Sequence, residues 1–148
     1  MAGLLAALFL ISVMAAVAVP RLSGMANAMR MDGEAARLAS ELVRFREMIM
    51  TRQPPHQDFA GATSEVEPEF DLSKDGYRIM KSKMEALGPR HLFPEGMTIS
   101  WSGGASGKVK FTLAGNAQPV TIFLRSGGEV RYVIIDRVGR VRVSLTPP

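Results

Sequence analysis

The chain has 148 residues, no cysteine and a formal net charge of +4 at pH 7. This length has room for one ordinary domain with an appended segment. Without cysteine, neither a disulfide framework nor a thiolate metal site can form. Direct counting places about +2 on residues 1–52, about −3 on residues 53–95 and about +5 on residues 96–148.

The first segment, residues 2–19, carries no charged side chain. As an α-helix it would rise roughly 27 Å, close to the roughly 30 Å hydrocarbon core of a bilayer. A cleaved secretory signal is an alternative, but no lysine or arginine precedes the apolar run, and the run exceeds the usual 7 to 15 or so apolar residues. A buried helix would need apolar partners on every side. We therefore expect residues 1–20 to form a transmembrane half-helix.

The helix is expected to continue beyond the apolar run. Pro20 follows that run, and a proline there would bend the helix without ending it. Apolar residues then recur at spacings of four, three and four, as Leu38, Leu42, Phe45 and Ile49. This is the period of a helix with one buried face. The sequence therefore predicts an amphipathic half-helix over residues 21–52, ended by two prolines.

Residues 53–96 have little pattern and are interpreted as a variable connection, with a short strand at 77–81 and a helical turn at 83–87. From residue 97 the apolar period changes to two, which indicates half-buried strands. These segments cover residues 97–101, 108–113, 120–124, 130–135 and 138–145. They predict an antiparallel sheet of about five strands over residues 97–148. The expected fold class is α+β, with the long bent N-terminal helix packed on that sheet.

Several segments together suggest a family. Residues 18–22 read Ala-Val-Pro-Arg-Leu after the apolar start, and later segments read FTLAG at 111–115, VTIFL at 120–124 and RYVIIDRVGRVRVS at 131–144. In these features the chain resembles the type IV pilin superfamily. It looks most like the minor pseudopilins of type II secretion, the H family, and the FimT-type minor pilins. The resemblance covers roughly residues 2–52 and 97–145.

This resemblance implies a structural subunit of a type II secretion pseudopilus or a type IV pilus-like filament, at its tip or in an initiation complex. The partners would be other pseudopilins or pilins, reached through the N-terminal helix, and the inner membrane. The protein would cross the bacterial inner membrane once, with its soluble domain in the periplasm. The family's basic leader and glutamate are missing, no cation precedes the apolar run, and Arg21 and Arg30 follow it, an arrangement that would place the domain on the cytoplasmic side. We therefore expect a leader upstream of Met1, cleaved by prepilin peptidase.

Two other functions stay open. The unit Gly139-Arg140-Val141-Arg142 matches the GRxR element of FimT-type minor pilins, and this match implies duplex DNA binding, with Arg131 and Arg137 in the same basic tail. The plainer interpretation is a solvated face on an edge strand. A soluble periplasmic protein with a cleaved signal peptide is the third possibility.

We recognise no sequence motif for catalysis, for cofactor binding or for metal binding. The only histidines, His56 and His91, stand far apart in the sequence. The run Gly-Gly-Ala-Ser-Gly-Lys at 103–108 lacks the spacing of a phosphate-binding loop and predicts a hairpin loop. The acidic residues between 65 and 75 lack the ligand spacing of a calcium loop. We expect no enzyme activity and no cofactor.

Overall fold

The computed structural model describes residues 2–51, 68–81, 85–104 and 106–148. Within the first 23 residues, the side chains described are those of Phe9, Ser12, Val13 and Met14.

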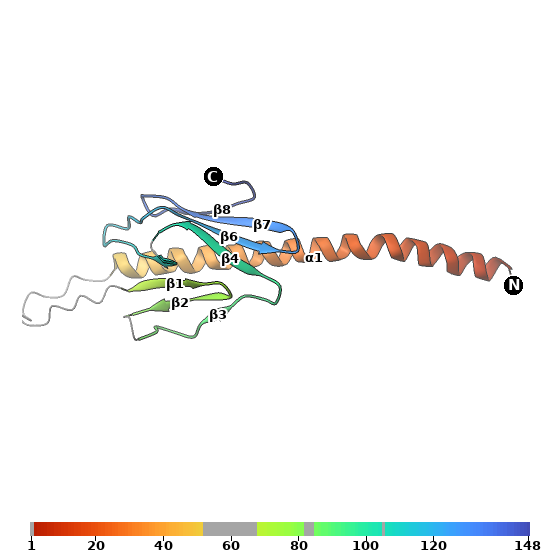
Figure 1. Cartoon of the computed structure of the whole chain (residues 1–148), viewed down its shortest axis with the longest axis horizontal. Coiled ribbons are helices and arrows are strands. Elements are labelled where there is room, and N and C mark those ends of the chain that lie inside the picture. Colours follow the sequence, from red (N-terminus) through yellow and green to blue (C-terminus); the bar gives the residue numbers. More distant parts are fainter. Residues whose placement is uncertain (1, 52–67, 82–84, 105) are drawn as a thin grey trace, which may run out of the picture.

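One helix and eight strands make up the described part of the chain. They are α1 (Ala2–Met50), β1 (Glu69–Ser73), β2 (Gly76–Met80), β3 (His91–Leu92), β4 (Thr98–Gly103), β5 (Lys108–Val109), β6 (Val120–Ser126), β7 (Glu129–Ile135) and β8 (Val141–Ser144). The strands form two four-stranded antiparallel sheets, in the orders β3-β2-β1-β5 and β4-β6-β7-β8. Figure 1 shows both sheets along the later half of α1, while the earlier half extends away from them.

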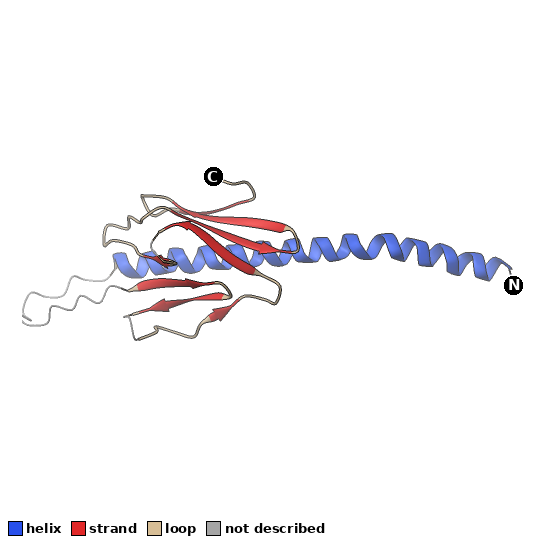
Figure 2. Cartoon of the chain, in the orientation of Figure 1, coloured by secondary structure: helices blue, strands red, loops and turns tan. Residues whose placement is uncertain are grey.

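One face of α1 forms the centre of the core. The buried side chains on this face recur at alternating spacings of four and three, which places them on one side of a helix. They are Met31, Ala35, Leu38, Leu42, Phe45 and Ile49. The helix contacts β6, β7 and β8, and the Phe45 ring lies 5.7 Å from that of Phe70 in β1. A single helical stripe therefore packs against both sheets (Figure 2).

The first sheet is built around the β1–β2 hairpin. Phe70 and Leu72 alternate with polar residues along β1 and are buried, as expected for a strand with one face on the core. Lys74 and Asp75 connect Ser73 to its partner Gly76. An added Cβ at Gly76 would overlap the carbonyl oxygen of His91. Glycine at this position therefore lets β3 approach β2 closely.

The second sheet is a meander of β6, β7 and β8, with β4 added at the other edge of β6. The β6–β7 pair has a two-residue glycine turn, in which Ser126 faces Glu129. Ile122, Leu124 and Val133 are fully buried on the face toward the core. They alternate with more exposed neighbours, so one face of this sheet packs on the core and the other faces solvent.

The expected fold class is wrong. The predicted single sheet of about five strands is replaced by two sheets of four, and residues 53–96, expected to be a connection, supply β1, β2 and β3. Only Lys108–Val109 of the expected strand 108–113 is a strand, and it pairs with β1 instead of its later neighbours. The period-two alternation of apolar residues identifies strands, but it does not specify which distant strands pair with one another. The turn expected at 83–87 lies partly outside the described residues, and Ala86 bridges Met80 in antiparallel fashion.

The expected membrane half of the helix and the single-pass inner-membrane location are also contradicted. A membrane crossing requires about 20 consecutive, mostly apolar residues. Among the residues that the structure describes, no helix meets the requirement of length and apolar character. The α1 helix passes through residue 20 without interruption, and Figure 1 shows it as one gently curved helix.

The core position of Phe45 gives a stability prediction. We expect Phe45→Ala to lower the free energy of unfolding by about 3–5 kcal/mol, because the ring is fully buried and its removal leaves a cavity. Val43 lies on the same helix but is 38% exposed, so Val43→Ala should change stability by only about 0.5 kcal/mol. Denaturant unfolding of both variants measures the difference. Equal effects would contradict this packing.

Candidate functional site

The residues predicted to pack the helix lie together in the core. Leu38, Leu42 and Phe45 are fully buried and Ile49 is 5% exposed. The side chain of Pro20 lies outside the described residues. Phe45 also lies 5.9 Å from the Phe111 ring, measured between centroids. This set serves the interior of the domain.

Polar contacts fix the helix at both ends of the second sheet. At the β6–β7 turn, Asn27 donates from Nδ2 to the carbonyl oxygen of Ser126 at 3.1 Å, and the Ser126 hydroxyl donates back to Asn27 Oδ1 at 3.1 Å. At the opposite end, Arg46 Nε donates to the carbonyl oxygen of Gly115 at 2.9 Å, and Nη2 donates to that of Val138 at 3.4 Å. Hydrogen bonds are directional, so they fix the position of the helix along the sheet.

Arg131, predicted as a DNA contact, lies in an internal ion pair. Its side chain is only 8% exposed, and it pairs with Asp32 of α1 and with Glu129, the latter at 2.9 Å. Hydrogen bonds to the carboxylates of Asp32 and then Glu129 raise the pKa of the Arg131 guanidinium above its usual value. A buried, paired guanidinium is a poor phosphate contact, because breaking the pair would leave a charge unpaired.

The other three arginines of the basic tail are exposed. Arg137 and Arg140 lie in the turn between β7 and β8, and Arg142 lies in β8. Arg140 donates from Nε to Asp136 at 3.0 Å, and its backbone N–H donates to the same carboxylate at 2.9 Å. The backbone hydrogen bond from Arg140 is the main reason that the pKa of Asp136 is lowered. The turn therefore fixes Arg140 just ahead of the strand that carries Arg142.

A groove between α1 and β2 was not predicted from the sequence. It has a volume of about 520 Å³, within the range of small ligand sites. Its helix wall includes Phe45 and Met48, and its opposite wall includes Ile79 and Leu87. Leu87 N–H donates to the Ile79 carbonyl oxygen at 2.8 Å, which holds the segment after β2 against the strand. The interior of the groove is therefore largely apolar.

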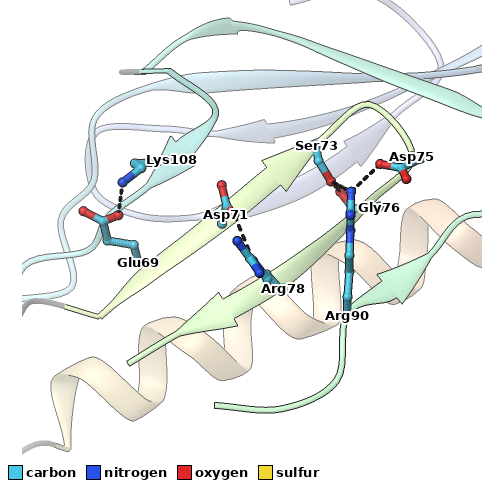
Figure 3. Close-up of polar contacts among 8 residues, drawn as sticks. All are labelled: Glu69, Asp71, Ser73, Asp75, Gly76, Arg78, Arg90 and Lys108. Atoms are coloured by element: carbon cyan, nitrogen blue, oxygen red, sulfur yellow. Dashed lines mark hydrogen bonds and ion pairs between the residues drawn. The ribbon is translucent and has the colours of Figure 1, made fainter. Parts of the chain in front are cut away.

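Arginine side chains surround this groove. Arg37 and Arg44 come from α1, Arg78 from β2 and Arg90 from the segment before β3. Figure 3 shows that Arg78 pairs with Asp71, at 3.1 Å, and that Arg90 contacts Ser73 and Asp75.

The two helix arginines differ from the two on the sheet side. Among the described residues, neither Arg37 nor Arg44 has a carboxylate within ion-pair distance, and both side chains are exposed. Glu41 is the one acidic residue in the described lining. The available positive charge of the groove therefore lies on its helix wall.

Tyr77 contributes a buried polar atom beside the groove. The residue is 4% exposed, and its hydroxyl is buried. Burial raises the pKa of Tyr77, and the positive charge and the side-chain hydrogen bond of Arg37 oppose this effect. Arginine can only donate, so the hydroxyl proton of Tyr77 itself has no acceptor in the described part of the chain. A buried donor without an acceptor costs roughly 1–3 kcal/mol. Packing of the Tyr77 ring alone therefore does not explain why its hydroxyl is buried here.

His91 contacts a carboxylate and an aromatic ring. His91 Nε2 lies 2.9 Å from Glu34 Oε2 and packs against the Tyr77 ring at 4.9 Å between centroids. His56 lies outside the described residues. Within the described ranges no group of three or more histidine or acidic side chains is placed to hold a metal ion.

The acidic segment and the glycine run have structural roles. Glu69, Asp71 and Asp75 each pair with a cation, as Figure 3 illustrates, and residues 65 and 67 lie outside the described part. The run at 103–108 does not form the expected hairpin loop. It connects β4 to β5, which belong to different sheets.

Comparison of the chain with models of protein families, with curated proteins and with solved structures gives no match. The family resemblance in the sequence therefore stays a prediction.

The turn that carries the basic tail gives a stability prediction. Gly139 has φ of +72°, and an added Cβ would overlap the Gly115 carbonyl oxygen. We expect Gly139→Ala to destabilise the fold by more than about 2 kcal/mol, because both backbone strain and the overlap contribute. Gly128 has φ of +85° but open space around its Cβ position, so Gly128→Ala should cost only about 1 kcal/mol. Thermal unfolding of both variants compares them, and the reverse order would refute this account.

The ion pairs of Glu69 give a pH prediction. This side chain is 12% exposed and pairs with Lys108 and with Lys110 at 2.9 Å. Its pKa is lowered, chiefly by the hydrogen bond from Lys108. The resulting stability is present at neutral pH and is lost as the pH falls from about 4.3, the usual pKa of glutamate, through the lower folded value.

We therefore expect Glu69→Gln to lower the free energy of unfolding at pH 7, with the deficit shrinking below about pH 4. The matched control is Glu95→Gln, because Glu95 is exposed and makes no ion pair among the described residues. Denaturant unfolding at several pH values measures both. A deficit that is constant down to pH 2 would contradict the assigned ion pairs.

Proposed function

We propose that this protein is a structural subunit of a filament of the type IV pilin kind, a minor pseudopilin or minor pilin. It associates with like subunits through the part of α1 that extends beyond the sheets. The sequence segments that resemble this superfamily support the choice of class. The exposed apolar side chains of α1 support the mode of association.

Those side chains are large and have little cover from the domain. They are Phe9, at 68% exposure, Val13 at 46%, Met14 at 73%, Met25 at 59% and Met29 at 68%. Scattered exposed apolar residues are ordinary, but a concentration on one protruding element indicates an interaction surface. This concentration is the observation that carries the proposal.

The helical phase of these residues strengthens the argument. At about 100° per residue, Val13 is in phase with Met31 and Phe9 with Phe45. The face that is buried against the sheets therefore continues along α1 to a part where no sheet covers it (Figure 1). By the same count, Met14, Met25 and Met29 lie about 100° to 160° around the helix from that face. Apolar residues on two faces suit a helix enclosed by several other helices.

DNA binding is less well supported as the main function. Of the four arginines considered, Arg131 is buried in ion pairs and Arg140 is bound to Asp136. Only Arg137 and Arg142 are left for phosphate contacts, and two such contacts give weak, strongly salt-dependent binding.

A photo-crosslinking experiment tests the filament proposal. The full chain would carry benzoyl-phenylalanine in place of Met25 or of Met29, in the cells that naturally make the protein. We expect crosslinks to apolar helices of other subunits or of further copies of this chain, identified by mass spectrometry of the linked peptides. The control position is Leu113, which is 56% exposed but lies in the loop after β5. If helix positions and control give the same products, or none, the proposal is wrong.

A further inference from the structure

We propose that the groove between α1 and β2 binds an acidic peptide segment of a partner protein, in which carboxylates alternate with apolar side chains. The inference does not depend on the filament proposal, because the groove is lined by α1 residues between 37 and 48, whereas the filament proposal uses exposed residues between 9 and 29. It rests on the distribution of charge, on the apolar lining and on the uncompensated polar atom beside the groove.

Charge selects an acidic ligand. Arg37 and Arg44 are separated by seven residues, so they lie on one side of α1 about 10 Å apart. Both are exposed and have no carboxylate at ion-pair distance in the described part of the chain. Arg78 and Arg90, on the facing wall, are already paired with Asp71 and Asp75. A ligand would therefore place its carboxylates against the helix wall, where arginine can bind them with two parallel hydrogen bonds.

The apolar lining favours a peptide ligand over a nucleic acid. The lining also includes the side chains of Phe45, Met48, Ile79 and Leu87, which cannot hydrogen-bond a nucleic-acid backbone or free phosphate. They suit the apolar side chains that would alternate with glutamates in a short peptide. Leu87 is 50% exposed at the edge of the groove and would be covered by such a ligand.

Tyr77 is the independent observation. Its hydroxyl belongs to a residue that lines this groove, and its neighbour is Arg37, a side chain that can only donate to it, so the hydroxyl proton has no acceptor in the described part of the chain. A buried donor left without an acceptor is costly. A carboxylate bound at Arg37 brings an acceptor to the place where the chain itself supplies none.

Binding of a synthetic peptide tests the proposal. The probe is a fluorescein-labelled peptide of about nine residues with alternating glutamate and leucine, titrated with the full chain at about 150 mM salt and followed by fluorescence anisotropy. We expect saturable binding, at least about tenfold weaker for the double variant Arg37→Gln, Arg44→Gln, because two charge-assisted contacts are lost. The control is Arg137→Gln, Arg142→Gln, which removes the same charge from exposed positions outside the groove.

A second pair of variants tests the apolar contact without changing charge. Leu87→Ser should weaken peptide binding, whereas Leu92→Ser should not, because Leu92 is similarly exposed but does not line the groove. The proposal is overturned if the peptide does not bind, if a lysine-for-glutamate peptide binds equally well, or if the tail variants lose as much affinity as the groove variants. Displacement of the peptide by duplex DNA or inorganic phosphate at equal charge would also overturn it, since the groove would then accept any anion.

Discussion

The packing of one stripe of α1 against two sheets is the contact on which the rest of the structure depends. Each sheet has four strands, and several are only two to five residues long. Small sheets of this kind need a second layer to bury their apolar face. Phe45 supplies part of that layer, through its ring contacts with Phe70 of β1 and with Phe111, which follows β5. The helix is therefore the common element of one core.

Apolar burial does not by itself fix where the helix lies along the sheets, because it has no direction. The polar contacts at the margins supply this constraint. Asn27 and Asp32 bind the β6–β7 end of the second sheet, and Arg46 binds the turns at its other end. The same constraint explains why Arg131 is unavailable to an external ligand. A side chain that resembles a surface cation in the sequence acts in the structure as a connection between helix and sheet.

The two proposed interaction surfaces use different physical chemistry. The protruding part of α1 offers apolar side chains on more than one face, a surface that favours association with other apolar helices. The groove combines free arginines with an apolar lining, which favours a smaller, charged ligand. The protruding part of α1 comes before the buried stripe in the sequence, and the groove lies beside that stripe. Binding at one surface therefore leaves the residues of the other accessible. Under the two proposals together, one chain holds a structural neighbour and a second protein.

The sequence alone determined the buried face of the helix, because the spacing of Leu38, Leu42, Phe45 and Ile49 is a local property that a helix converts directly into a stripe. It also located most strands after residue 97, since alternation is local too. It did not determine how the strands pair. The hairpin of β1 and β2, and the pairing of β5 with β1, depend on contacts between segments that no local period records. Only the tertiary structure decided the groove and the state of the basic residues, because Arg37 meets Tyr77, and Arg131 meets Asp32, through folding of distant parts of the chain.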